Sequence, residues 1–168
     1  MKTFLRPNTS NNQEREPGQR GSLLLVMALY SNPKWLSTVR AAVERLTATL
    51  GFKEEHCRSV TRALDEALTN IVRHAYNNRH DQPITMYFRK VQRKQEVEVQ
   101  YGIEITLCDR GPACDATKWH GRSPGEIRPG GLGLQIIHDA MDIVEFSRKG
   151  NTNRLRLVKY LGQAGLAP

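Results

Sequence analysis

The chain has 168 residues, of which 39% are hydrophobic and 25% are charged, as in ordinary globular proteins. This length fits one domain with a tail rather than two full cores. The longest apolar run, Leu23 to Tyr30, is far shorter than the roughly 20 residues of a membrane helix, so we expect a cytoplasmic protein without membrane contact. Cys57, Cys108 and Cys114 lack metal-ligand spacing, which argues against a zinc site or a disulfide framework.

The charge balance is basic, with 25 Lys and Arg against 17 Asp and Glu and a net charge of +8. Such an excess fits nucleic acid, an acidic protein partner or solubility. Nucleic-acid binding would predict a basic stripe with interleaved aromatics, yet aromatics make up only 7% of the chain. The candidate basic residues straddle a predicted hairpin instead of lining a helix: Arg148, Lys149, Arg154, Arg156 and Lys159. We therefore expect no direct nucleic-acid contact.

The first half of the chain predicts a tail, a strand and two helices. Residues 1–20 combine Pro, Gly and polar residues without apolar periodicity, which predicts a flexible extension before a domain at residues 21–165. The apolar run that follows reads as a buried strand. Asn32 can cap a helix that begins at Pro33, and apolar residues from Trp35 to Leu50 recur at helical spacing up to Gly51. A second amphipathic helix runs from about residue 60 to residues 77–78.

The second half predicts two hairpins and a helix. Alternating residues 84–89 and 97–108 predict two strands, the second covered on one face only. Residues 110–130 are rich in Gly and Pro, which predicts a long functional loop. A helix at 132–140 and strands at 143–147 and 154–160 complete the order. This order predicts an α+β two-layer sandwich, with a mostly antiparallel sheet and helices on one face.

The second helix carries a polar stripe that could serve chemistry. Glu66, Asn70 and His74 are spaced four residues apart, so an α-helix places them in line. A carboxylate there could accept a proton, while an amide oxygen could ligate a hard cation. A solvated polar face has the same pattern, although asparagine is unfavourable in mid-helix.

Two further motifs follow the strongest strand. Asp109 at the strand end, with Gly111 after it, could accept a hydrogen bond from a ligand amino group that approaches the bare backbone, although an ordinary turn has the same letters. The glycine-rich segment 128–134 leads into a helix, whose N-terminal amides suit an anion. It matches neither a Walker loop nor the GxGxxG dinucleotide motif, and a flexible hinge would look alike.

Taken in order, these motifs are far more specific than each alone. Together they resemble the GHKL (Bergerat) ATP-binding fold of histidine kinases, gyrase-type ATPases and anti-sigma factor kinases, and within it the RsbW and SpoIIAB type of serine kinase. The resemblance covers roughly residues 23–161 and rests on ALDEALTNIVRHAY, CDRGPACD, PGGLGLQIIHDAMDIVEF and RLRLVKYL.

The resemblance implies a role for each matching residue. Glu66 would be the general base for the attacking hydroxyl, and Asn70 would hold Mg²⁺ against the phosphates of ATP. Asp109 would accept from the adenine amino group, with Gly111 permitting the approach. Further ATP contacts are expected from the glycine lid and nearby basic residues: Arg73, Arg128, Gly130, Gly131, Leu132, Gly133 and Leu134, of which Arg128 is not fixed by the family motif.

The function that the resemblance implies is a protein serine/threonine kinase that is also an anti-sigma factor. It would phosphorylate a small anti-anti-sigma (STAS-type) partner and sequester a sigma factor. The alternative is a nucleotide-binding anti-sigma or regulatory module with little or no kinase activity, against which Glu66 argues. Histidine kinases and gyrase-type ATPases are disfavoured by length, and a homodimer stays open.

Overall fold

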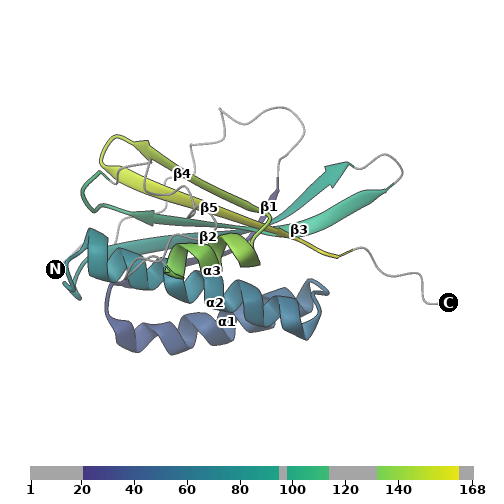
Figure 1. Cartoon of the computed structure of the whole chain (residues 1–168), viewed down its shortest axis with the longest axis horizontal. Helices are drawn as coiled ribbons and strands as arrows, with labels where there is room; N and C mark the ends of the chain where they lie inside the picture. Colours follow the sequence, from purple (N-terminus) through teal and green to yellow (C-terminus); the bar gives the residue numbers. More distant parts are fainter. Residues whose placement is uncertain (1–20, 95–97, 114–131, 163–168) are drawn as a thin grey trace.

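The computed structural model describes residues 21–94, 98–113 and 132–162, which form a sheet and a layer of helices (Figure 1). The predicted tail at 1–20 and the predicted domain end at 165 lie outside these ranges. In chain order the elements are β1 (Ser22–Tyr30), the 3-10 turn η1 (Pro33–Trp35), α1 (Leu36–Thr49), α2 (Glu54–Asn70), the π turn η2 (Ile71–Ala75), β2 (Pro83–Lys94), β3 (Val99–Asp109), α3 (Leu132–Ala140), β4 (Ile143–Lys149) and β5 (Thr152–Tyr160).

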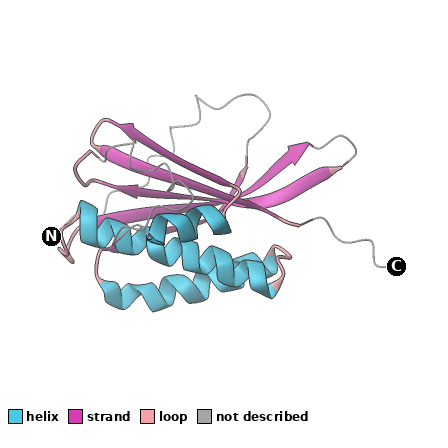
Figure 2. Ribbon diagram, in the orientation of Figure 1, coloured by secondary structure: helices cyan, strands magenta, loops and turns pink. Residues whose placement is uncertain are grey.

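The sheet has the strand order β1-β2-β3-β5-β4, and all neighbouring strands are antiparallel. Figure 2 shows the helices on one face of this sheet. The predicted α+β two-layer sandwich is therefore confirmed. Because β5 inserts between β3 and β4, Asp109 at the end of β3 is paired with Asn153 of β5. This pairing brings together residues that are far apart in the sequence.

The core lies between the two layers. Alternate residues of the central strands point at the helices and are almost fully buried, and α2 supplies the opposing apolar face. Each such side chain stabilises the fold by roughly 1.5–3 kcal/mol. The main contributors are Val60, Leu64, Leu68, Ile84, Met86, Phe88, Ile103, Ile105, Leu107, Leu155 and Leu157.

The N-terminal end of the predicted first helix differs in detail from a single α-helix, while its C-terminal end is as predicted. The side chain of Asn32 caps as predicted, accepting from the amide of Lys34 at 3.1 Å, but it caps the 3-10 turn that precedes α1. Trp35 is 43% exposed, so its predicted place on the buried face is wrong. Gly51 ends the helix with φ +89°, a conformation that favours glycine.

The second helix also ends in a different geometry. After Asn70 the chain forms a π turn, and Asn77 and Asn78 then adopt left-handed φ values of 48° and 59°. The predicted end near these asparagines is confirmed, but a π turn has more residues per turn than an α-helix. His74 lies within that turn and is exposed, so the predicted continuous stripe stops at Asn70.

Strand β3 is buried on both faces at its centre, contrary to the predicted exposure of one face. Glu104, on the face away from the helices, is 1% exposed and accepts from Nε of Arg156 at 2.7 Å. Nη1 of the same arginine donates to Glu145 at 2.8 Å. A buried carboxylate needs such a partner, because an unpaired charge away from water is costly.

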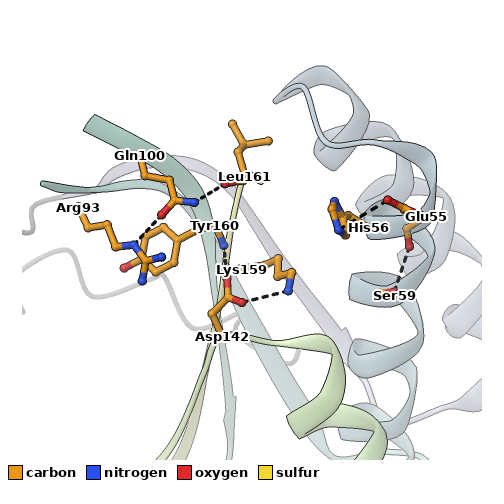
Figure 3. Close-up of polar contacts among 9 residues, drawn as sticks. All are labelled: Glu55, His56, Ser59, Arg93, Gln100, Asp142, Lys159, Tyr160 and Leu161. Atoms are coloured by element: carbon orange, nitrogen blue, oxygen red, sulfur yellow. Dashed lines mark hydrogen bonds and ion pairs between the residues drawn. The ribbon is translucent and has the colours of Figure 1, made fainter. Parts of the chain in front are cut away.

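The end of β3 opposite Asp109 is fastened to the end of β5 (Figure 3). Asp142 accepts from the amide of Tyr160 at 2.7 Å and from Nζ of Lys159 at 3.0 Å, while Arg93 stacks on the Tyr160 ring. The side chain of Gln100 accepts from Arg93 and donates to the carbonyl of Leu161. These contacts fix the sheet at that end. Among the described helices, none is long and apolar enough to cross a membrane.

Candidate active site

The residues Glu66, Asn70 and Gly133 meet at the junction of α2 and α3. A Cβ built on Gly133 would lie 2.7 Å from Oε2 of Glu66 and 3.7 Å from Nδ2 of Asn70. Both side chains are partly buried, and neither makes a hydrogen bond or ion pair with the residues that the structure describes. The apolar face of α2 is buried against the sheet, so its opposite edge presents these two polar groups to the start of α3. The carboxylate and the amide are therefore uncommitted.

Asp109 and Gly111 lie beside the π turn. Asp109 is 7% exposed, and its Oδ1 accepts from the amide of Gly111 at 2.7 Å. A Cβ on Gly111 would lie 2.5 Å from Cβ of Ala75 and 3.0 Å from its carbonyl oxygen. Only glycine fits this approach of the strand end to η2. The second carboxylate oxygen, Oδ2, makes no hydrogen bond with the residues that the structure describes.

Three residues that the sequence did not indicate as site residues hold the end of β3 at Asp109 and Gly111. Asn153 is 2% exposed, and its Nδ2 lies 2.8 Å from Oδ1 of Asp109. Nη1 of Arg148 donates to the carbonyl of Gly111 at 3.1 Å and to Oδ1 of Asn153 at 2.5 Å. The hydroxyl of Tyr76 accepts from the amide next to Asp109 at 2.8 Å and donates to a carbonyl at the start of β2 at 2.7 Å.

Burial raises the pKa of the Tyr76 phenol above its usual value of 10.0, although the bond from the backbone amide of Arg110 acts in the opposite direction. The phenol therefore stays neutral and keeps its proton for the bond that it donates. No local pattern in the sequence marks Tyr76 or Asn153, because their partners belong to other strands. Only the sheet order reveals them.

The remaining predicted site residues are more dispersed. Arg73 in the π turn is exposed, and Leu132 at the start of α3 is 70% exposed. Leu134 is partly buried and packs on the main core. The predicted lid residues Gly130 and Gly131, like the candidate phosphate contact Arg128, lie outside the described residues, and their roles stay predictions.

Several of the basic residues considered for nucleic acid make contacts within the chain, among them Arg148, Arg156 and Lys159. Arg148 bonds to the Asp109 corner, Arg156 to two glutamates and Lys159 to Asp142. Paired charges of this kind contribute less to a basic surface than free ones. The described residues also contain no group of three or more His, Cys, Asp or Glu that could enclose a metal by themselves.

A model of the histidine kinase-like ATPase domain matches residues 29–159 of the chain. The chain belongs to this ATPase domain family. Serine-protein kinase RsbW of Oceanobacillus iheyensis is 28% identical over 150 residues, covering 82% of this chain and 86% of that protein. Serine-protein kinase RsbW of Listeria innocua is 30% identical over 126 residues, covering 72% and 77% of the two chains. Within the family, the chain is therefore of the GHKL, RsbW-like type.

Two further relatives agree with this ATPase domain assignment. Serine/threonine-protein kinase BtrW of Bordetella bronchiseptica is 29% identical over 130 residues, covering 75% of this chain and 81% of that protein. A crystal structure of the RsbU and RsbW domains of a Mycobacterium tuberculosis protein superposes with a TM-score of 0.51 at 16% identity. The match covers 80% of this chain and 30% of that longer one, and it supports the shared fold.

Proposed function

We propose that the chain is an ATP-dependent protein serine/threonine kinase and anti-sigma factor. The names of its RsbW and BtrW relatives, which are serine-protein and serine/threonine-protein kinases, support the kinase activity. The observation that carries the proposal is the uncommitted pair Glu66 and Asn70 against Gly133. A purely structural polar stripe would bond to its neighbours or to solvent, whereas these groups face the first turn of α3. The substrates are ATP and a serine or threonine hydroxyl of a protein partner.

Glu66 is the residue that we propose as the general base in this reaction. The hydroxyl oxygen attacks the γ-phosphorus of ATP, the bond to the β,γ-bridging oxygen breaks, and ADP leaves with that electron pair. The hydroxyl proton passes to the Glu66 carboxylate, which has no competing partner among the described residues. Because phosphoryl transfer passes through a loose transition state, the protein mainly positions the reactants and offsets charge.

The donor set fits Mg²⁺, which prefers oxygen ligands and usually keeps one or two protein ligands beside substrate phosphates. The side-chain amide of Asn70 is uncommitted, lies next to the Glu66 carboxylate and can offer its oxygen. When bound, the cation would neutralise charge on the phosphates. Asn70 is the residue that we propose to hold it.

Asp109 is proposed to accept the adenine amino group through its free Oδ2, and Gly111 leaves the backbone open beside it. Arg73 and the glycines from Gly130 to Gly133 are proposed for the phosphates. We further propose a STAS-type anti-anti-sigma protein as phosphoacceptor and a sigma factor as the sequestered partner. We propose a cytoplasmic location for the chain itself, and neither role requires contact with DNA. The proposal also includes a homodimer, which a measurement of the oligomeric state in solution would test.

The test is transfer of labelled phosphate from ATP to the cognate anti-anti-sigma protein. Glu66→Ala should abolish transfer and keep ATP binding, while Asn70→Ala should lose Mg²⁺-dependent ATP binding. Asp65→Ala is the matched control, because this neighbouring carboxylate of α2 is bonded to Arg40 of α1 instead of facing α3. Normal transfer by the Glu66→Ala protein would refute the base assignment.

The competing function is an anti-sigma module with little or no kinase activity. It predicts ATP binding and sigma-factor capture without phosphate transfer in the parent chain. The same assay therefore separates the two functions.

A further inference from the structure

The amide of Asn153 is held in one orientation by its surroundings. Its Oδ1 lies 2.5 Å from Nη1 of Arg148, and a guanidinium can only donate. The oxygen must therefore face Arg148, and the NH₂ group must face the end of β3. There Nδ2 lies 2.8 Å from Oδ1 of Asp109, 3.1 Å from the carbonyl of Pro112 and 3.3 Å from the carbonyl of Gly111.

This arrangement determines which oxygen of Asp109 is available. Oδ1 accepts from the amide of Gly111 and from Asn153, which occupies both of its lone pairs. Oδ2 accepts nothing from the described residues. Asn153 is 2% exposed and Asp109 is 7% exposed, so water does not readily replace these bonds. The carboxylate thus presents a single acceptor in a fixed direction.

We propose that Asn153, oriented by Arg148, is a positioning residue that makes the site selective for a purine with an amino group at C6. The inference rests on the proposed ATP site and goes beyond it, because it assigns base selectivity to two residues of the β4–β5 hairpin. An ionised carboxylate accepts from the C6 amino group of adenine. It repels the C6 carbonyl of hypoxanthine, and none of the described residues donates at Oδ2 to compensate.

A purely structural role for Asn153 is the competing explanation, since the same bonds tie the hairpin to residues 111 and 112. That role predicts weaker folding and equal loss of all nucleotides. Selectivity between ATP and ITP separates the explanations, because the two nucleotides share the ribose and triphosphate and differ at C6. The readout is equilibrium binding, so it does not depend on phosphate transfer.

The experiment compares Asn153→Thr with Asn153→Val. The two side chains have nearly the same shape, and only threonine can donate to Asp109. The parent should bind ATP at least tenfold more tightly than ITP. Asn153→Val should lose about tenfold in ATP affinity with ITP affinity unchanged, as expected for one charge-assisted hydrogen bond. Asn153→Thr should stay within about threefold of the parent for both nucleotides.

Arg148→Met provides a second variant at an exposed position, where folding is expected to survive. It frees the Asn153 amide to turn and should lower the ATP/ITP ratio about threefold. Ser147→Ala, one residue earlier on β4, is the control that should change nothing, because the Ser147 side chain makes no hydrogen bond with the residues that the structure describes. Equal losses of ATP and ITP, or equal ATP binding by the Thr and Val variants, would overturn the inference alone. A parent chain that binds no ATP would overturn the proposed function and the inference together.

Discussion

Replacing Gly133 with alanine tests whether the position of the Glu66 carboxylate controls catalysis. The added Cβ would lie 2.7 Å from Oε2 of Glu66, whereas ordinary contacts begin at 3.4 Å. Because Oε2 is the far end of a flexible side chain, the carboxylate can retreat by about 0.7 Å without moving the backbone. A displacement of about 1 Å in a reacting group can cost roughly 100-fold in rate. We therefore expect transfer to fall about 10- to 100-fold.

The same substitution should not weaken the fold. Alanine is favoured over glycine by up to about 1 kcal/mol in a helix interior, and Gly133 lies near the start of α3 with an ordinary negative φ. The free energy of unfolding should stay the same or rise slightly. Denaturant unfolding measured beside phosphate transfer therefore separates lost catalysis from lost structure. Gln135→Ala, which removes a contact with Asp139 on the same helix, should leave transfer intact.

The combination with Glu66→Asp makes the test specific, because aspartate keeps a carboxylate on a shorter side chain that leaves room for the added methyl group. If Gly133→Ala acts through the Glu66 carboxylate, it should cause a smaller fold-loss of transfer in the Glu66→Asp protein than in the parent. Full activity of the Gly133→Ala protein would refute this reasoning. Equal fold-losses from Gly133→Ala in the two backgrounds would also refute it, since they would show an effect that does not pass through Glu66.

Two predictions concern stability. Tyr76→Phe removes two part-buried hydrogen bonds, one to the carbonyl of Pro83 and one from the amide of Arg110, and should cost about 1–2 kcal/mol by denaturant unfolding. Burial raises the folded-state pKa of Tyr76, so the stabilisation that its hydroxyl provides is present below pH 10 and is lost as the pH rises through that pKa. The difference in unfolding free energy between the parent and the Tyr76→Phe protein should therefore narrow in alkali. A constant difference would contradict this. Arg156→Met removes an ion-pair partner of the buried Glu104 and should cost about 2–3 kcal/mol, against less than about 1 kcal/mol for Glu145→Gln, whose side chain is 60% exposed. Equal losses of unfolding free energy for Arg156→Met and Glu145→Gln would contradict the view that the burial of Glu104 makes its ion pair important.

The elements and the sheet layer could be predicted because their signals are local. The apolar face of α2 has a helical period, and β3 alternates strictly from Val99 to Leu107, so each element follows from its own residues. The burial of Glu104 could not be predicted in this way. The alternation shows which face of β3 carries Glu104. The side chain that covers it is Arg156 of β5, 52 positions later in the chain.

The residues of the candidate site also form two groups, those that the sequence predicts and those that only the fold reveals. Glu66, Asn70, Asp109 and Gly111 are recognisable because the groups that touch a ligand must have particular chemistry at particular spacings. The residues that orient these ligand-contacting groups need only bring a hydrogen-bonding atom close to them, and many kinds of side chain can do so. Asn153 is 44 positions from Asp109, and the two meet because β5 inserts beside β3.

The contacts that the basic side chains make in the fold affect how the net charge of +8 is interpreted. In the sequence, Arg148 counts as one more basic residue of a hairpin. In the fold, its Nη1 donates to the Gly111 carbonyl and to Oδ1 of Asn153, and so determines which atom of Asn153 faces Asp109. Arg156 pairs with a carboxylate that has almost no contact with water. Arg148 and Arg156 therefore hold internal contacts of the sheet, which is a physical reason why a basic composition does not by itself indicate nucleic acid.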